Sequence, residues 1–315
     1  MRSVALLALG GSLLLAGCAS LPTPRERLVN RNARPVPAGA TLTVVSYNAL
    51  HGFGDRLNDR TLEARLGLLA RALEAADADV IILQEVSLTP ESRHGSVAER
   101  LRDLLDGSAR PGEAYGSAVA MAHGSRLISF FEGSAILSRF FIESAETIGY
   151  RAQPLVPPER RIALRVVLRG ERGPVEVVGT HLTNVEARRR STLVRDLQAR
   201  ELVDRVLRAG DPSRPLVIGG DFNALPGSAV VRGLLAAAAV DAWASTRPGD
   251  DGFTALEGEV TDAGARAVER IDYVFVRGAR VLSAGPFLDR PGTGPDGSPL
   301  WASDHVGVLV RIELP

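Results

Sequence analysis

Residues 80–85 read Val80-Ile81-Ile82-Leu83-Gln84-Glu85, an apolar run that ends in a carboxylate. A short, continuous apolar run is typical of a strand that is buried on both faces of its sheet. Glu85 has no cationic neighbour in the sequence, so its side chain must either reach solvent where the strand ends or bind a cation. The run therefore predicts a buried strand, with Glu85 as a metal ligand or, alternatively, a solvated strand-end residue.

Five further polar motifs stand at the ends of apolar runs, spread over the whole chain. They are Ser46-Tyr47-Asn48, Thr180-His181-Leu182, Gly220-Asp221-Phe222-Asn223, Arg270-Ile271-Asp272-Tyr273 and Ser303-Asp304-His305. Together with Glu85 they supply carboxylates, imidazoles and side-chain amides. Mg²⁺ prefers carboxylate oxygens, and imidazole can give or accept a proton near neutral pH. The whole set predicts metal-assisted attack on a phosphate ester.

Some of these motifs have plainer interpretations when taken alone. Asn48 fits a turn, and so do Asp221 and Asn223. Side chains two residues apart on a continuing strand point the same way, however, so this last pair can hold a water and a phosphate oxygen. Gly219 and Gly220, just before them, let the backbone approach another group closely.

The two histidines of the pattern are candidates for proton transfer. A lone histidine is most often structural, but His181 and His305 both belong to the larger set of motifs. Asp272 is a candidate to hold one imidazole in position. Asp304 adjoins His305, and adjacent side chains often point apart, so we expect Asp304 to bind metal or water on its own account.

The composition describes a globular protein of 315 residues, with 45% hydrophobic and 23% charged side chains. This length allows one large domain or two small ones, and the chain has no visible internal break or repeat. A formal net charge of zero disfavours a sequence-independent DNA-binding protein, which usually carries a basic surface. It leaves open a local patch of arginine, the residue that supplies every positive side chain.

The N-terminus looks like a bacterial lipoprotein signal. Its apolar stretch, residues 4–15, is too short for a membrane-spanning helix, and the only cysteine, Cys18, follows small residues. We expect a signal peptide over residues 1–17, a lipidated cysteine and disordered tether over residues 18–40, and the folded domain over residues 41–315. With Cys18 lipidated, no disulfide can form.

This signal also predicts a location. Lipid chains on Cys18 would anchor the protein at the cell envelope. Ala19 stands where an aspartate would retain a lipoprotein in the inner membrane, so the resemblance implies the outer membrane, facing the periplasm or the exterior. The alternative is an ordinary secretory peptide and a secreted or periplasmic protein.

Apolar periodicity predicts the secondary structure of the domain. Helices are expected at residues 59–76, 187–208 and 228–238, the second with Leu193, Leu197, Leu202 and Val206 facing inward. Strands are expected at residues 42–48, 80–83, 134–137, 162–168, 175–179, 215–218, 271–276 and 306–312. Strict alternation of strands and helices is missing, so two packed sheets with helices outside fit best.

Taken together, these motifs resemble the endonuclease/exonuclease/phosphatase superfamily over residues 41–313. Its members include pancreatic-type DNases, AP endonucleases, sphingomyelinases and inositol polyphosphate 5-phosphatases. The resemblance implies an α+β fold, a four-layered αββα sandwich of two mixed, mainly antiparallel β-sheets flanked by helices. It also implies a site where the two sheets meet at one edge, and hydrolysis of phosphate esters with Mg²⁺, or Mn²⁺, as cofactor.

The resemblance further implies which residues bind the metal and the substrate. Glu85 matches the family's Mg²⁺ glutamate, Asn48 matches the asparagine beside it, and Asp304 lies near the metal. Arg161, which precedes an expected strand, resembles an arginine that contacts the phosphate. Its neighbour Arg160 leaves this alignment open by one residue.

The same resemblance implies roles in proton transfer. His305, held by Asp272, would take a proton from a water that Asp221 positions. His181 and Asn223 would hold the phosphate or protonate the leaving group. The tyrosine typical of AP endonucleases is not evident, which disfavours a base-excision function.

Three functions follow from these observations. The favoured one is a Mg²⁺-dependent phosphodiesterase or nuclease at the cell envelope, acting as a monomer. The alternative is a phospholipid phosphodiesterase of the sphingomyelinase kind, which predicts exposed aromatic or apolar residues at the rim of the site; Phe287, Leu300 and Trp301 of the last loop are candidates. A non-catalytic binding lipoprotein is the least favoured, because every expected polar residue is present. Two long loops, residues 247–267 and 286–301, are either functional or plain surface linkers.

Overall fold

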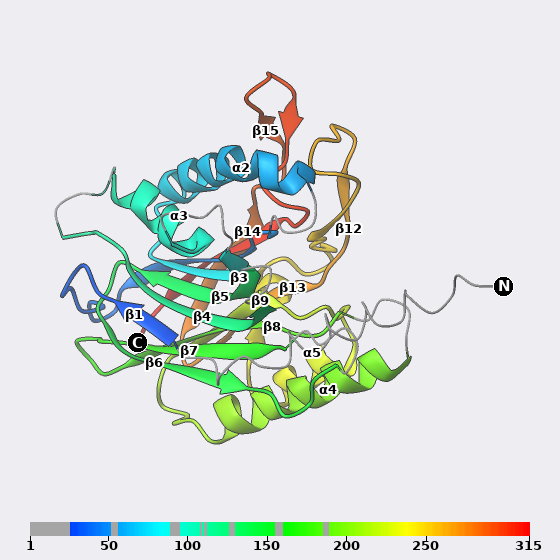
Figure 1. Cartoon of the computed structure of the whole chain (residues 1–315). Helices are drawn as coiled ribbons and strands as arrows, with labels where there is room; N and C mark the ends of the chain where they lie inside the picture. The colour runs from blue at the N-terminus through cyan, green and yellow to red at the C-terminus, as the bar shows by residue number, and fades with distance from the viewer. Residues whose placement is uncertain are drawn as a thin grey trace.

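Two β-sheets lie face to face at the centre of the molecule (Figure 1). The computed structural model describes residues 26–51, 56–88, 95–107, 109, 112–125, 130–154, 160–184 and 189–315. The first sheet has seven strands in the order β1-β4-β5-β3-β2-β17-β14, and the second has six in the order β10-β13-β9-β8-β7-β6. The pairs β2–β3 and β8–β9 are parallel, and the remaining pairs in these two sheets are antiparallel.

The strands have the following bounds. The first sheet contains β1 (Glu26–Val29), β4 (Gly116–Ser125), β5 (Phe130–Ser138), β3 (Val80–Leu88), β2 (Thr41–Asn48), β17 (Gly307–Glu313) and β14 (Arg280–Phe287). The second contains β10 (Val240–Asp241), β13 (Asp272–Arg277), β9 (Leu216–Asp221), β8 (Val175–His181), β7 (Ile162–Leu168) and β6 (Ile142–Gly149). Two short hairpins, β11 (Ala255–Glu257) with β12 (Arg266–Glu269) and β15 (Gly292–Thr293) with β16 (Pro299–Leu300), fall largely within the two predicted loops.

Helices cover the outer face of each sheet and complete four layers (Figure 1). The first sheet carries α2 (Arg56–Ala75) and α3 (Val97–Asp106), and the second carries α4 (Arg189–Leu202), the π-helical turn η1 (Val203–Arg208) and α5 (Ala229–Ala236). The short helix α6 (Ala242–Thr246) joins the apolar cluster between the sheets. Separate apolar clusters lie under each helical layer. The predicted αββα sandwich is confirmed.

Glycines bring the two sheets close together near their shared edge. A Cβ atom at Gly219 of β9 would lie 2.7 Å from Ile82 Cδ1 of β3, and one at Gly179 of β8 would lie 2.8 Å from Ile82 Cγ2. Both separations are too short for any larger residue, because protein interiors are already close-packed. The close approach expected at Gly219 is therefore a contact between the two sheets.

The predicted tether is wrong for residues 26–40. Residues 26–29 form β1, which pairs with β4 at the edge of the first sheet. Asn30 exchanges two hydrogen bonds with the backbone of Ile142, and Val36 is 1% exposed. Backbone pairing with an open sheet edge orders this short segment, and it needs no apolar face for that. Its sequence therefore shows no apolar periodicity.

The helix predicted at residues 187–208 differs in two ways. Residues 189–202 are α-helical and residues 203–208 form a π-helical turn, which rotates the inward face. Leu202 and Val206 are buried as expected, but Leu193 and Leu197 are 61% and 38% exposed. Gln198 occupies the inner side of this part of the helix, where it accepts from Thr183 N.

The signal peptide and Cys18 lie outside the described residues, so the lipoprotein assignment stays a prediction. Among the residues that the structure does describe, no helix has the length and apolar character needed to cross a membrane.

Buried Arg65 of α2 ties together two segments of the domain. Its side chain is 1% exposed and donates to the carbonyl oxygens of Ala49, Leu50 and Ala302, each at 3.1 Å. These carbonyls belong to the loop that follows Asn48 and to the loop that carries His305. The guanidinium therefore joins two loops that are distant in sequence.

We expect Arg65→Met to lower the free energy of unfolding by at least about 3 kcal/mol, because it leaves buried carbonyls without donors at roughly 1–3 kcal/mol each. Denaturant unfolding of the purified protein measures the loss. Arg71→Met is the matched control, since Arg71 lies on the same helix and is exposed. Equal stability of the two variants would contradict the role assigned to Arg65.

Candidate active site

Strand ends from both sheets meet at one edge. In the second sheet, His181 of β8 is paired with Asp221 of β9, and Asp221 is paired with Asp272 of β13. In the first sheet, Asn48 ends β2 beside Gln84 of β3, and the loop before β17 carries His305. The second sheet thus contributes the ends of two parallel strands and the start of an antiparallel one. The first contributes the end of β2, the middle of β3 and the segment just before β17, so Glu85 lies within its strand and not at the predicted strand end.

A bulge in β3 re-aims Glu85. The pairing of β3 with β5 shifts register between Leu83 and Val86, and Glu85 has a left-handed φ of +54°. Such a bulge breaks the alternation of side chains along a strand, and a left-handed backbone is uncommon for a residue with a Cβ. The bulge lets Glu85 face the site, where its Oε1 accepts from Asn48 Nδ2 at 3.0 Å.

Asn48 lies at the centre of the site and is fully buried. Its Nδ2 also donates to Asp221 Oδ2 at 3.2 Å and lies 3.5 Å from His305 Nε2, while its Oδ1 accepts from Leu50 N at 3.1 Å. In this orientation the amide holds Glu85 and Asp221 in place from between them. The predicted role of Asn48 as a metal ligand stays a prediction.

His305 is held by Asp272, as predicted for this pair. His305 Nδ1 lies 2.9 Å from Asp272 Oδ2, and the backbone N–H of Asp272 donates to Thr254 Oγ1 at 3.1 Å. The other ring nitrogen lies 3.9 Å from Asp221 Oδ2. Burial opposes charge on His305, but Asp272, Asp221 and Asp304 raise its pKa well above the ordinary value.

His181 and Arg161 form a second pair across the edge. Arg161 Nη1 lies 3.0 Å from His181 Nδ1, and His181 Nε2 lies 3.4 Å from Asp221 Oδ2. Burial, reinforced by Arg161, lowers the pKa of His181 well below its ordinary value, so the imidazole is neutral. Arg161, rather than Arg160, therefore contacts the site residues. Asp221 lies between two imidazoles, of which His181 has a lowered pKa and His305 a raised one.

Asn223 and Asp304 lie at the margin. Asn223 has a left-handed φ of +48°, donates from its backbone to Asp221 Oδ1 at 2.8 Å, and donates from its side chain to Leu182 O at 3.0 Å. Asp304 Oδ1 lies 3.9 Å from His305 Nε2, and the Asp304 side chain is 42% exposed. All the predicted polar residues therefore gather at one edge, with Asp304 the most open to solvent.

Sequence reasoning missed three residues beside Glu85. His51 Nε2 lies 3.6 Å from Glu85 Oε2 and 3.3 Å from Glu132 Oε2, and His123 Nε2 lies 3.9 Å from Glu132 Oε1. Burial, with Arg161 nearby, lowers the pKa of His123 to about 4. The signal available for His51 was its position three residues after Asn48. Glu132 lies inside a strand and gave no signal.

The donors at this edge fit a divalent cation. Asp221, Asp272 and His305 each offer one donor atom, all within 4.8 Å of one another. Burial and the charge of Asp272 raise the pKa of Asp221 to about 7. For Glu85, burial would raise the pKa, but His51, Asn48 and His305 lower it overall. Crowded carboxylates of this kind are stabilised by a bound cation with oxygen ligands.

The aromatic rim expected of a phospholipid enzyme is not formed by the predicted residues. Phe287, Leu300 and Trp301 are 4%, 1% and 5% exposed. Phe287 packs edge-to-face on Tyr47, and Trp301 Nε1 donates to Asp262 O at 3.0 Å, so both are structural. Burial of these apolar side chains in the folded loops is more favourable than their exposure at a rim.

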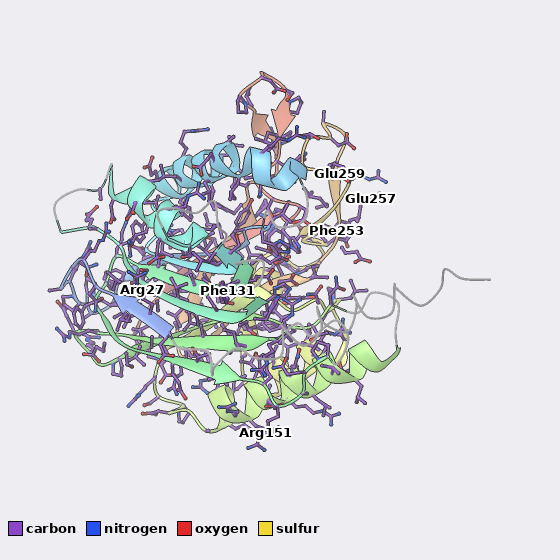
Figure 2. All side chains as sticks on the ribbon, viewed as in Figure 1. Arg27, Phe131, Arg151, Phe253, Glu257 and Glu259 are labelled. Carbon is purple, nitrogen blue, oxygen red and sulfur yellow. The ribbon has the colours of Figure 1, made fainter. Side chains whose placement is uncertain are left out.

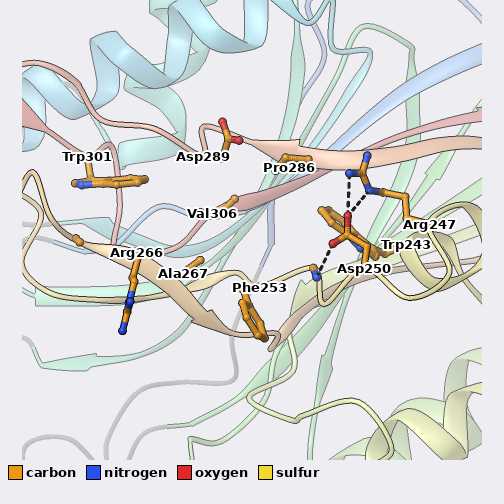
Figure 3. Close-up of a pocket in the computed structure, with 12 residues that line it drawn as sticks. Trp243, Arg247, Asp250, Phe253, Arg266, Ala267, Pro286, Asp289, Trp301 and Val306 are labelled. Carbon is orange, nitrogen blue, oxygen red and sulfur yellow. Dashed lines mark hydrogen bonds and ion pairs between the residues drawn. The ribbon is translucent and has the colours of Figure 1, made fainter.

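A pocket of about 310 Å³ adjoins His305 through its neighbour Val306 (Figure 3). Trp243, Phe253 and Trp301 are among its lining residues, and Asp250 pairs with Arg247 at its edge. Phe253, 42% exposed, lies on the segment that leads into β11 (Figure 2). Among the described residues, Phe253 is the exposed aromatic side chain nearest in sequence to Thr254. The hydroxyl of Thr254 accepts from the backbone N–H of Asp272.

The profile of the Endonuclease/Exonuclease/phosphatase family matches residues 45–305. The chain therefore belongs to this family, and it is a metal-dependent hydrolase of phosphate ester bonds. No curated protein matches the sequence.

Solved structures share the fold. A family protein from Leptotrichia buccalis has 19% identity and a TM-score of 0.65, with 87% of this chain and 100% of that one covered. A mannosyl-6-phosphatase from Bacteroides thetaiotaomicron has 18% identity and a TM-score of 0.64, with coverage of 86% and 99%. D. rerio TDP2 with a single-stranded DNA product has 16% identity and a TM-score of 0.62, with coverage of 87% and 99%.

Proposed function

We propose that this protein is a Mg²⁺-dependent phosphodiesterase that acts on nucleic acid or a related phosphodiester. The observation that carries the proposal is the position of Asp221 between the imidazoles of His181 and His305, with Glu85 joined to it through Asn48. Carboxylates, a held imidazole and a cationic arginine around one point are the groups that phosphoester hydrolysis needs.

The cation would be held by Glu85, with Asn48 beside it and Asp304 able to contribute from the margin. It would supply charge neutralisation on the phosphoryl oxygens. Carboxylate ligands with water suit Mg²⁺, and Mn²⁺ suits the same donors.

The other residues divide the work of binding and proton transfer. Asp272 fixes the ring of His305 through Nδ1, which leaves Nε2 facing Asp221 and the site. His305 Nε2 can then exchange a proton with a water positioned by Asp221. Arg161 and neutral His181 lie together on the opposite side of Asp221, where they can bind a phosphate oxygen and serve the leaving group.

The buried state of Phe287, Leu300 and Trp301 favours nucleic acid over a phospholipid substrate. The neighbouring structures in this fold include a protein bound to single-stranded DNA and a sugar phosphatase. The assay should therefore include nucleic acid and a sugar phosphate. Sphingomyelin is added to test the phospholipid alternative.

Purified protein is tested with Mg²⁺ on bis-p-nitrophenyl phosphate, single-stranded DNA, RNA, sphingomyelin and mannose 6-phosphate. We expect turnover of the diesters that disappears with a chelator and returns with Mg²⁺. Turnover of the monoester alone would contradict the phosphodiesterase proposal, and no turnover of any of these substrates would contradict the site as a whole.

We further propose that the enzyme is anchored at the cell envelope through a lipid on Cys18. Cys18→Ser is expected to move the protein from the membrane fraction to the soluble fraction, because the acyl chains supply the binding. Immunoblotting of the two fractions measures the shift. Persistent membrane association of the variant would rule out this anchor.

A further inference from the structure

A second group of metal-binding side chains meets at the other oxygen of Glu85. His51, Glu85 and Glu132 each offer one donor atom, and the three atoms lie within 4.8 Å of one another. His51 Nε2 is 3.6 Å from Glu85 Oε2 and 3.3 Å from Glu132 Oε2. Two carboxylate oxygens thus converge on one imidazole nitrogen, which carries at most one proton.

We propose that His51, Glu85 and Glu132 form a second cation site, which takes an imidazole-accepting divalent ion such as Zn²⁺. Donor atoms arranged tetrahedrally about 2.1 Å from an ion lie about 3.4 Å apart, and the two separations at His51 Nε2 fall on either side of that value. One nitrogen and two carboxylate oxygens, with a fourth position open, make the donor set of an open zinc site.

The two oxygens of Glu85 serve different neighbours. Oε1 accepts from Asn48 Nδ2 at 3.0 Å, on the side of Asp221, whereas Oε2 faces His51. Glu85 could therefore offer one oxygen to each of two cation sites. This sharing rests on the proposed function, which places the first cation at Glu85.

The oxygens of Glu132 are divided in the same way. Oε1 lies 3.6 Å from Arg161 Nη1 and 3.9 Å from His123 Nε2, whereas Oε2 faces His51. A plainer interpretation makes Glu132 only the counterion of Arg161. That interpretation accounts for Oε1, but it does not explain why Oε2 and Glu85 Oε2 converge on the same nitrogen of His51.

The backbone supports this geometry. Glu85 has a φ of +54° at a bulge, and Leu50, next to His51, has a φ of +49°. Left-handed residues with a Cβ cost energy and gather at sites where function requires a particular side-chain direction. The side chains of His51 and Glu85 are 31% and 17% exposed, so an ion can reach them from solvent.

The second site adjoins the proposed phosphate position. Arg161 contacts both Glu132 and His181, so it links the two groups of side chains. A divalent ion here would add a second positive centre beside the phosphate.

To test this site, metal-stripped protein is equilibrated with Zn²⁺ in the presence of excess Mg²⁺, and the bound zinc is quantified after dialysis. The wild type is expected to keep about one Zn²⁺ per chain, the stoichiometry of a single open site. Glu132→Gln and His51→Asn should each weaken zinc binding more than about 100-fold, because even the loss of an outer partner costs about 10- to 100-fold. His51 is partly exposed, so its variant tests the site even if the buried Glu132→Gln variant folds poorly.

Two further variants separate the possible outcomes. Glu143→Gln is the matched control, because Glu143 is an exposed carboxylate that pairs with Arg169 and belongs to neither cation site; it should keep the zinc. Asp221→Asn should lose hydrolysis and keep the zinc, since Asp221 belongs to the proposed chemistry and not to the group formed by His51, Glu85 and Glu132. No zinc on the wild type, or equal zinc on the wild type and His51→Asn, would overturn the second site. Hydrolysis with Mg²⁺ alone would in that case leave the proposed function standing.

Discussion

Asp221→Asn is expected to lower kcat by at least about 10³-fold while making the metal-free protein more stable at pH 8. The loss of activity follows from the position of Asp221, whose Oδ2 lies 3.4 Å from His181 Nε2 and 3.9 Å from His305 Nε2. A neutral amide cannot balance a protonated imidazole or hold a cation as a carboxylate does. Hydrolysis of bis-p-nitrophenyl phosphate with Mg²⁺ measures the loss.

The gain in stability follows from the pKa of Asp221. Burial and Asp272 raise that pKa to about 7 in the folded protein, from about 3.9 in an unfolded chain. Stability therefore falls as the pH rises from about 4 to about 7, because the unfolded chain releases its proton first. Above pH 7 the full penalty is present, and the amide removes roughly 2–4 kcal/mol of it, at about 1.4 kcal/mol per pKa unit.

Thermal unfolding of metal-free protein at pH 8 and pH 4.5 measures this second effect. The Tm of Asp221→Asn should exceed that of the wild type by several degrees at pH 8 and by much less at pH 4.5. Added Mg²⁺ should stabilise the wild type more than the variant, because a ligand stabilises only the state that binds it. Asp251→Asn, on an exposed loop, is the control and should change neither quantity. Lower stability of Asp221→Asn at pH 8 would refute the crowding of charge at the site.

His305→Ala is expected to lower kcat by about 10²- to 10⁴-fold, the usual contribution of a positioned acid–base group. Its ring is fixed through Nδ1 by Asp272 at 2.9 Å and presents Nε2 to the site, 3.5 Å from Asn48 Nδ2. Removing the ring takes away both the proton-transfer group and the partner of a buried carboxylate. Steady-state kinetics with Mg²⁺ over a range of pH measures the loss.

Two variants distinguish a chemical role of His305 from a structural one. Asp272→Asn keeps the ring but removes the carboxylate that orients it, so kcat should fall while substrate binding, read as KM, changes little. Asp251→Asn, on an exposed loop, is the control; its kcat should stay within about twofold of the wild type. A loss of less than tenfold in His305→Ala would remove His305 from the proposed chemistry.

Much of the fold could be read from local patterns. The apolar run of residues 80–83 lies within β3, and the leucine spacing of residues 59–76 lies almost entirely within α2, because burial imposes the period of each element on its own sequence. The N-terminal segment was misjudged. β1 is ordered by pairing with β4, a partner about 90 residues away in the sequence, and such pairing leaves no periodic signal.

The site shows the same division. Glu85, Asp221 and His305 could be predicted as site residues because polar side chains at the ends of apolar runs need a partner. Their neighbours Glu132 and His51 could not, since Glu132 sits inside a strand and becomes significant only where β5 passes β3. The aromatic residues of the last loop were wrongly expected at the rim because a loop sequence does not reveal which of its side chains the fold buries.

By itself, then, the sequence determined the composition of the site, the identity of the core-forming runs and the layered architecture that those runs favour. Only the tertiary structure decided the bulge that turns Glu85, the central place of Asn48 between two carboxylates, and the meeting of His51 with Glu132. The physical reason is that apolar burial acts on each element locally. Side-chain direction at an edge depends on backbone register between strands that are far apart in the chain.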